Sequence, residues 1–465
     1  MNKQLILWVA CTAIFFEALD IAVLNMVLPV LQNQFHQDSA TVQWLQTVYV
    51  LFYGGFLITG GRLADTRGRK NIFLLGSFLF LAASAAAGFA NGFEWLMACR
   101  ALQGQAAALA VPAALSIVTN TFPDPEERSR ALSTFSAFAA VGSGSGLALG
   151  GIIATYWGWQ WTFFINVPVI LAVLVLAWRC IGKDAPAAAR SASGSGFRGI
   201  LLTVVILLLS YCIHTLAQLP EHYLLTIGSV VIMLACLYLF SKRERRSTNP
   251  LIDVQLFSDR STIAGNSCTL LLGGIFIGYL FLLSVFLQQN LHLSAAKAGM
   301  LLFPFSFFST LVTRFIVPVL FARLKPVKTA ITGMCLMLTG CLLLGVAMFI
   351  PYPLAAVLLS LLCVTGSGMS IVYPGVTVLS LQHIPAHKQG IAAGVSTTAY
   401  FMGAGLGLSF ISLLLQLFST GEQQSNLLPA LVLPVVCAVV SVGLLRREAA
   451  VVNRQSSVVS DRSEY

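Results

Sequence analysis

Apolar stretches of about twenty residues recur from one end of this sequence of 465 residues to the other. A helix of that length can cross the roughly 30 Å hydrocarbon core of a lipid bilayer. The composition agrees with this, because 57% of the residues are hydrophobic and only 9% are charged. The sequence therefore predicts an all-α polytopic membrane protein.

The first apolar stretch continues to Pro29, which is far longer than the apolar region of a signal peptide. We therefore expect it to remain in the mature chain as the first membrane span. In all we predict fourteen spans, at residues 5–30, 42–62, 71–90, 95–118, 130–154, 162–182, 199–219, 224–241, 261–287, 297–320, 328–350, 354–378, 389–415 and 428–445.

The positive charges follow this alternation of spans. If the N-terminus lies inside the cell, all of the 27 Lys and Arg residues except Arg100, Lys297 and Arg314 fall on the inner side or at inner span ends. This is the positive-inside distribution, and it predicts that both termini are cytoplasmic. The net charge of +10 thus reflects topology, and we do not expect nucleic acid as a partner. Short loops favour the inner (cytoplasmic) membrane of a prokaryotic cell.

All ten cysteines fall inside apolar runs, and the spacing typical of metal-binding cysteines is absent. We therefore expect neither disulfides nor a metal site. The sequence also contains no GxxxxGK[ST] phosphate-binding loop, so ATP is not expected to drive the protein. No cofactor is predicted.

The two longest inner connections are residues 182–199, rich in Ser, Gly and Ala, and residues 241–260. The first has the composition of a flexible linker. Six spans precede these connections and six follow them. We predict an N-terminal six-helix bundle at 1–182, a linker with two inserted spans at 183–260, a C-terminal six-helix bundle at 261–445 and a cytoplasmic tail at 446–465.

Landmark residues of the first half recur in the second. Gly104 and Pro112 recur as Gly366 and Pro374, an offset of 262 residues. Glycines 142, 144 and 146 recur as glycines 403, 405 and 407, an offset of 261 residues. Two sets at nearly one offset suggest duplicated halves, as in many transporters, although Gly and Pro are common in membrane helices generally.

Of seventeen Asp and Glu residues, only Glu17 and Asp20 lie deep inside a predicted span. Buried ionisable groups in lipid are costly and usually mark function. Their separation of three residues puts both on one face of a helix. Two carboxyl groups so close do not both ionise easily, so at least one is suited to take up and release a proton. The alternative is a carboxyl group that is permanently neutral or paired for structure.

Arg100 is the expected partner of Asp20. At 1.5 Å per residue, Asp20 lies about 15 Å below the outer end of its span and Arg100 about 8 Å below the same side of its own span. A buried arginine needs an acid or water nearby. Arg314 lies near an inner span end and can extend to the interface, so we interpret it as structural.

Five segments resemble the major facilitator superfamily, and specifically its fourteen-span drug:proton antiporter branch. They are "ALDIAVLNMVLP" (18–29), "GRLADTRGRK" (61–70), "RALQGQ" (100–105), "WGWQWTFFINVP" (157–168) and "NPLIDVQLF" (249–257). They occur in the order typical of this branch and span most of the chain. The resemblance implies the major facilitator fold, with two six-helix bundles and two additional transmembrane helices.

The resemblance also implies roles for particular residues. Asp20 and Arg100, with Glu17 beside them, are expected to carry proton coupling. In the loop motif, Asp65 is expected to pair at a neighbouring helix end and hold the outward-facing state, with glycines allowing a tight turn. The residues expected to form this conformational latch are Gly61, Asp65, Gly68, Arg69 and Lys70. The residues expected to line a substrate cavity are Asn25, Tyr53, Gln103 and Tyr373.

The sequence departs from the branch at three points. Leu147 stands where the span 5 motif has a proline that would kink the helix, which weakens the inference of strict antiport. The second copy of the loop motif, "FARLKPVK" (321–328), has no acid matching Asp65. Acidic residues found in the later spans of some polyspecific cation exporters are missing, which leaves divalent organic cations in doubt as substrates.

We expect a monomeric, proton-coupled exporter of small amphipathic or lipophilic compounds that works by alternating access in the lipid bilayer. A dedicated exporter or facilitator of one metabolite or siderophore is the alternative. A polytopic membrane enzyme is a remote alternative, because the short outer loops lack the acids, histidines and nucleophiles that catalysis needs. No catalytic residue is predicted.

Overall fold

The computed structural model describes residues 3–182, 195–216, 219–247, 259–385, 389–418 and 427–462. The motif segment 249–257 and most of the predicted linker 182–199 lie outside the described residues. The described chain is helical, with short connections and no strand. Fourteen of its helical segments are long and apolar enough to cross a membrane, so the predicted all-α fold with fourteen spans is confirmed.

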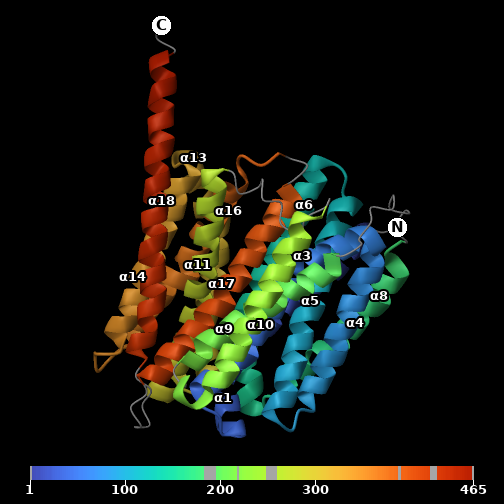
Figure 1. Ribbon diagram of the computed structural model, residues 1–465, viewed down its shortest axis with the longest axis vertical. Helices are drawn as coiled ribbons and strands as arrows, with labels where there is room; N and C mark the ends of the chain where they lie inside the picture. The colour runs from blue at the N-terminus through green and yellow to red at the C-terminus, as the bar shows by residue number, and fades with distance from the viewer. Residues whose placement is uncertain are drawn as a thin grey trace. The chain divides into compact units, whose positions relative to one another are not determined.

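Figure 1 shows the helices in colours that follow the chain. The helices of the first part of the chain are α1 (Lys3–Phe35), α2 (Ser39–Val42), α3 (Trp44–Arg67), α4 (Arg69–Gly88), α5 (Phe93–Thr121), α6 (Pro125–Tyr156), α7 (Trp161–Phe164), α8 (Asn166–Cys180), α9 (Ser195–Thr215) and α10 (Leu219–Arg245).

The later helices are α11 (Arg260–Val285), α12 (Ala295–Leu311), α13 (Val317–Arg323), α14 (Pro326–Ala347), α15 (Leu354–Leu361), α16 (Met369–Leu381), α17 (Gln389–Leu417) and α18 (Leu428–Arg462). Short π-helical segments interrupt or end three of these spans, at Phe286–Asn290, Val312–Ile316 and Leu362–Gly368. π-helical turns are rare in proteins, and those that do occur are often found at functional sites.

Contacts divide the chain into two compact units. The first consists of Met1–Ile252, Leu280–Ser306 and Leu408–Ala430. The second consists of Asp253–Tyr279, Phe307–Gly407 and Leu431–Tyr465. The first unit therefore contains α1 to α10 and also parts of α11, α12 and α17.

Within the first unit, α6 packs along α1 through a row of glycines four residues apart. A Cβ atom at Gly142 would overlap the carbonyl oxygen of Phe15, and one at Gly146 would lie 2.6 Å from that of Leu19. Small residues at this spacing let helix backbones approach closely. The helix α6 is continuous through Leu147, as expected where the motif proline is absent.

Within the second unit, α17 packs along α11 in the same way. A Cβ atom at Gly403 would overlap the carbonyl oxygen of Leu270, and one at Gly407 would lie 2.6 Å from the Cα atom of Gly274. The glycines that echo each other in the sequence therefore serve the same purpose in each half. This recurrence supports the predicted duplication.

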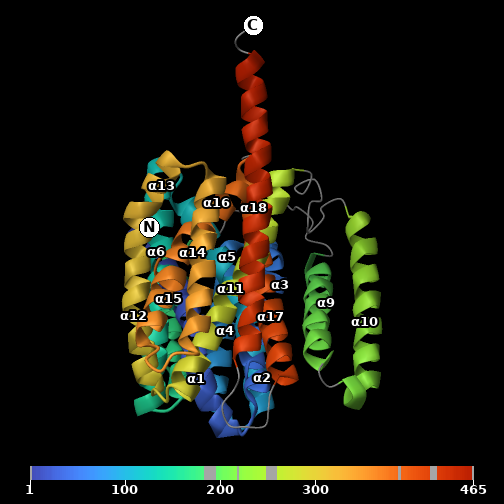
Figure 2. The same cartoon turned by 90° about the vertical axis from the view of Figure 1, so that its left-hand side faces the viewer.

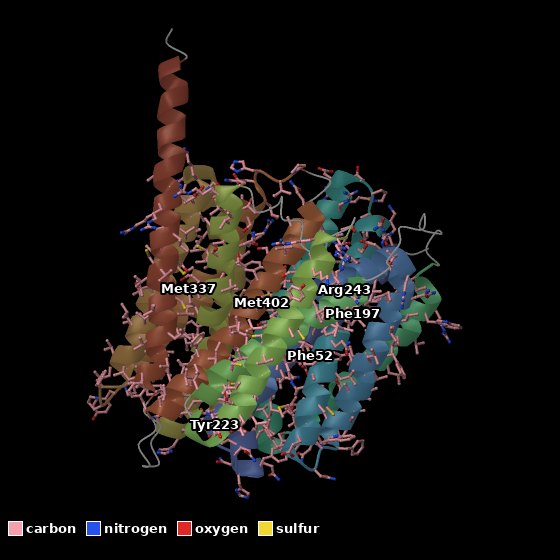
Figure 3. The ribbon with its side chains drawn as sticks, in the orientation of Figure 1. Phe52, Phe197, Tyr223, Arg243, Met337 and Met402 are labelled. Atoms are coloured by element: carbon pink, nitrogen blue, oxygen red, sulfur yellow. The ribbon has the colours of Figure 1, made fainter. Side chains whose placement is uncertain are left out.

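Helices α9 and α10 are the two spans between the sequence halves, and Figure 2 shows them side by side. The helix α9 packs on α3, where a Cβ atom at Gly55 would overlap the side chain of Thr203. A buried ion pair of 3.2 Å joins Arg198 of α9 to Glu244 of α10. At the same end, the Arg243 guanidinium lies 4.4 Å from the centre of the Phe197 ring. Figure 3 labels these two side chains.

The helix α10 differs from its neighbour in exposure. Its large apolar side chains, such as Leu224, Val231 and Tyr238, are mostly exposed. In a membrane such a surface contacts lipid. The helix α9 packs between α3 and α10 but also keeps exposed apolar side chains, such as Phe197 and Ile200.

Candidate functional site

The helix α1 places two carboxyl groups inside the first unit. Most of its other residues are apolar, and more than half of its 33 residues are buried against its neighbours. Glu17 is 7% exposed and Asp20 is 3% exposed. The site is therefore cut off from bulk water, and each carboxyl group depends on protein partners.

Asp20 meets Arg100 of α5 directly. The guanidinium NH1 donates to Asp20 Oδ2 at 2.5 Å. Arg100 is 0% exposed. An ion pair at this depth is stable only when further hydrogen bonds satisfy the remaining polar atoms. The structure thus brings together two residues that lie 80 positions apart in the sequence.

Several further groups contact Arg100, although its NH2 has no hydrogen-bond partner among the described residues. Its NH1 also donates to Gln103 Oε1 at 3.0 Å, and its Nε donates to the Leu45 carbonyl at 3.3 Å. The Tyr49 ring lies 4.2 Å from the guanidinium carbon, a cation–π distance. Gln103 in turn donates to Ser84 Oγ at 2.9 Å. The charge of Arg100 is therefore held by α1, α3 and α5 together.

The second oxygen of Asp20 is bound by Asn166 of α8. The Asn166 amide Nδ2 donates to Asp20 Oδ1 at 3.0 Å. Asn166 was not predicted as a site residue, although it lies in the segment 157–168 that carries the family resemblance. A polar residue in an otherwise apolar stretch was the available signal. Pro168 lacks an N–H, which suits the break between α7 and α8 just before it.

Both oxygens of Asp20 thus accept hydrogen bonds from donors. An ionised carboxylate is an acceptor only, so this arrangement satisfies the charged form. Removing either donor would leave a buried negative charge with one partner fewer, which is costly. The geometry therefore describes a buried ion pair whose members depend on one another.

Glu17 lies one helical turn away and has different partners. Its side chain hydrogen-bonds with Tyr53 of α3. Its Oε1 has no hydrogen-bond partner among the described residues. Glu17 also lines a small cavity of approximately 20 Å³ between α1, α4, α5 and α8, next to Ser77. That is room for about one water molecule.

The other residues predicted for a substrate cavity lie in three settings. Gln103 is part of the Arg100 network described above. Asn25 is fully buried, and its Nδ2 donates within α1 to the Ile21 carbonyl at 3.2 Å. Tyr373 lies in the second unit, where its ring centre is 6.0 Å from that of Tyr400. Asn25, Gln103 and Tyr53 thus lie in the first unit, and Tyr373 lies in the second.

The loop motif forms the turn between α3 and α4. Gly68 has a φ of +97°, a conformation that favours glycine. Gly61 was predicted to help the turn, but this is wrong because Gly61 lies inside α3, where a Cβ atom would make an ordinary contact of 3.7 Å with Pro112. The turn therefore depends on Gly68.

The charged residues of this motif have distinct partners. Asp65 is exposed and lies 3.7 Å from Arg69, which is four residues further on, across the turn at Gly68. Lys70 donates to the carbonyls of Trp178 and Ile181 at 2.7 and 2.5 Å, at the end of α8. A cation at a helix C-terminus satisfies free carbonyls and favours the helix dipole. Lys70 thus connects the motif to α8, the helix that also carries Asn166.

The described residues do not supply the group of ligands that a metal site needs. No group of three or more His, Cys, Asp or Glu residues there could hold a metal ion. The ten cysteines, all within the described ranges, are unpaired. The candidate site is therefore the buried network of Asp20, Glu17 and Arg100.

Comparisons with known proteins agree with this architecture. The family model of the Major Facilitator Superfamily matches residues 10–408. The lincomycin resistance protein of Streptomyces lincolnensis is 31% identical over 408 residues, which cover 84% of this chain and 80% of that protein. The multidrug resistance protein Stp of Mycobacterium tuberculosis is 28% identical over 431 residues, or 92% of this chain and 79% of that protein.

The fold is similar to that of solved transporter structures. A POT family transporter in complex with a thioalcohol-conjugated peptide superposes with a TM-score of 0.70 over 96% of each chain, at 15% identity. Together with the fourteen membrane-spanning helices and the family match over most of the sequence, this places the chain among membrane transporters. The chain belongs to the Major Facilitator Superfamily.

Proposed function

We propose that this protein is a proton-coupled exporter of small amphipathic or lipophilic compounds that works by alternating access. The observation that carries the proposal is the buried pair of Asp20 and Arg100, sealed within the first unit. Such a pair is expensive in a membrane and usually marks function. Relatives named for resistance to lincomycin and to multiple drugs support the same function.

Protonation of Asp20 supplies a driving force for conformational change. When Asp20 takes up a proton, Arg100 loses the negative charge that balances it. A buried arginine without a counter-charge is unfavourable. Protonation therefore favours a conformation in which Arg100 reaches water or another acceptor, and release of the proton favours the paired conformation.

Glu17 is the second proposed proton carrier. Its hydrogen bond with Tyr53 and its place beside the small cavity fit a group that exchanges protons with trapped water. We assign it the smaller effect, because Asp20 alone is ion-paired. Tyr53 and Gln103 then connect proton chemistry to the substrate cavity, to which we also assign Asn25 and Tyr373.

The loop motif is proposed as the conformational latch. Lys70 holds the end of α8 and Gly68 provides the turn, while Asp65 and Arg69 are accessible for pairing in another conformation. The latch would then fix one of the two states between which the transporter alternates.

We further propose that the protein resides in the inner membrane as a monomer, with both termini in the cytoplasm and with no cofactor. The distribution of Lys and Arg supports this orientation. The proton gradient across that membrane then supplies the energy. The recurring glycine contacts of α1 with α6 and of α11 with α17 support two six-helix bundles, with α9 and α10 as the added pair.

The experiment is transport by purified protein in proteoliposomes under an imposed pH gradient, with and without a protonophore. The panel contains lincomycin, the lipophilic monocation ethidium and the dication methyl viologen. We expect transport of the first two that the protonophore abolishes, and poor transport of the dication. Transport that does not respond to the gradient would contradict proton coupling, and response to a single compound would favour a dedicated exporter.

A further inference from the structure

We propose that Asn166 is a positioning residue for proton coupling, which gives Asp20 a hydrogen-bond partner in both of its protonation states. This inference rests on the proposed function, because it assumes that Asp20 carries the proton. The proposal adds α8 to the coupling machinery. It also assigns a role to a polar residue of the segment 157–168.

The geometry shows a shared carboxyl group. Arg100 of α5 donates to Asp20 Oδ2, and Asn166 of α8 donates to Asp20 Oδ1 at 3.0 Å. Asn166 is fully buried. Its own Oδ1 has no hydrogen-bond partner among the described residues. A buried amide oxygen without a donor is unfavourable, and it therefore needs an explanation.

The chemistry of the amide provides that explanation. An asparagine side chain has two donors on nitrogen and an acceptor oxygen, whereas arginine can only donate. A protonated Asp20 has an O–H that needs an acceptor, and Arg100 cannot supply one. The free Oδ1 of Asn166 can, after the amide rotates about its last side-chain bond, a soft and roughly two-fold torsion whose half-turn exchanges the oxygen and the NH2 group.

The other groups facing Asp20 do not replace Asn166. Glu17 of α1 is a second carboxyl group, and Tyr53 of α3 is its hydrogen-bond partner. Gln103 Oε1 already accepts from Arg100. Tyr49 of α3 places its ring face against Arg100. Asn166 is thus the group in contact with Asp20 that serves as a donor in one state and as an acceptor in the other.

The test is the pH dependence of transport by Asn166→Leu in proteoliposomes. Leucine has a similar size but no polar atoms. The charge-assisted hydrogen bond to the carboxylate is the stronger of the two that are lost. We therefore expect the profile to move to more alkaline pH by about one unit. Asn166→Gln keeps the amide on a longer side chain, and we expect a smaller shift.

Asn266→Leu is the matched control. Asn266 is also a buried asparagine whose Oδ1 has no partner in the described residues, but its Nδ2 donates to the Thr262 carbonyl and to no acid. We expect its pH profile to be unchanged. A profile of Asn166→Leu that matches the wild type would overturn the proposal and make Asn166 a packing residue.

Infrared difference spectra report the protonation of Asp20 directly, so they test the proposal even in a variant that transports poorly. The protonated carboxyl band that disappears in Asp20→Asn should shift in Asn166→Leu, because the acid loses its acceptor. An unshifted band would contradict the proposal even without transport. If the wild type shows no transport driven by a pH gradient, the proposed function fails instead, and the band still reports whether Asn166 binds the acid.

Discussion

The contact of α1 with α6 and the contact of α11 with α17 have the same packing but different chemistry. In both, glycines four residues apart meet the backbone of the partner helix. Phe15 and Leu19 of α1 correspond in these contacts to Leu270 and Gly274 of α11, an offset of 255 residues. At that offset, Asp20 corresponds to Ile275, which is fully buried.

The same difference extends to the other members of the site. Glu17 corresponds to Leu272 at the offset of 255 residues, and Arg100 to Leu362 at the offset of 262 residues that relates Gly104 to Gly366. The second half thus repeats the helix packing with apolar residues at the charged positions. Close glycine packing is therefore a property of both halves, whereas ionisable residues occupy these positions in the first half alone.

Among the variants that test this difference between the halves, Asp20→Asn should have the largest effect on transport. An amide cannot take up or release a proton, so transport driven by a pH gradient should fall to the level of empty vesicles. The measurement is gradient-driven transport by the purified variant in proteoliposomes. Ile275→Val, at the corresponding apolar position, is the control and should retain transport. Wild-type rates in Asp20→Asn would place the coupling elsewhere.

Arg100→Ala should have the next largest effect. Loss of one partner from a buried ion pair costs about 3–5 kcal/mol, and proton release from Asp20 should stall. Arg100→Lys should recover only part, because lysine lacks the planar guanidinium. The measurements are the thermal stability in detergent and the pH profile of transport.

The control for Arg100→Ala is Leu362→Ala. Leu362 is only partly buried, so this variant should cost less than the roughly 2–5 kcal/mol of a fully buried leucine and leave the pH profile unchanged. In the double variant of Asp20→Asn with Arg100→Ala, the losses of stability should be less than additive, because no buried charge is left alone. An unshifted pH profile in Arg100→Ala would make Arg100 purely structural.

Because both halves use glycines for close helix packing, substituting these glycines should cause similar losses of stability in the two halves. Gly142→Ala and Gly403→Ala each place a methyl group against a partner backbone carbonyl, and each should cost about 1–3 kcal/mol. Gly394→Ala, in the same helix as Gly403, meets nothing within 4 Å and should leave stability unchanged or slightly raised. Melting temperatures in detergent compare the three, and an equal loss at Gly394 would argue against the glycine contacts.

Asp65→Asn tests the loop motif, whose second copy has no corresponding acid. An exposed ion pair is worth up to about 1 kcal/mol, so turnover should slow a few-fold at unchanged substrate affinity. The exposed Glu126 pairs with Arg130 at 3.4 Å in the same i,i+4 arrangement, and Glu126→Gln is the matched control. Equal losses of affinity and rate in Asp65→Asn would count against a latch.

The smallest expected effect concerns the start of α11. Burial raises the pKa of Asp259, but hydrogen bonds from His383 and Thr262 outweigh it and hold the pKa below its ordinary value of 3.8. A lowered folded-state pKa stabilises the protein above the unfolded pKa, and this stability is lost as the pH falls through the folded-state pKa. The contribution should be at most about 1 kcal/mol.

Asp259→Asn should therefore lower the melting temperature slightly at pH 7, and the difference should vanish as the pH falls well below 3.8. Melting curves across that range measure it. Glu127→Gln, which breaks the exposed 2.9 Å pair with Lys3 near the start of α1, is the control in the first unit. A difference that persists at the lowest pH would show that Asp259 acts by packing.

Much of the fold could be predicted because membrane spans are a local property. The length of an uninterrupted apolar stretch is enough to identify a membrane span, and the fourteen predicted spans match fourteen helices. The pairing of Asp20 with Arg100 could be anticipated from depth, since both residues are costly in lipid unless they meet. Gly61 was misplaced, because a glycine near a turn looks the same in sequence whether or not it has a positive φ.

Asn166 could not be identified from spacing, because its partner lies 146 residues away on another helix. Nor could the contact of α9 with α3 be identified, because the sequence predicted α9 only as one of two spans inserted between the bundles. The sequence by itself determined the number of spans, the depth of the charged residues and the recurrence of the glycines. Only the tertiary structure decided which helix faces which, because that choice depends on side chains meeting across distant segments, where small residues allow contact and buried charges require partners.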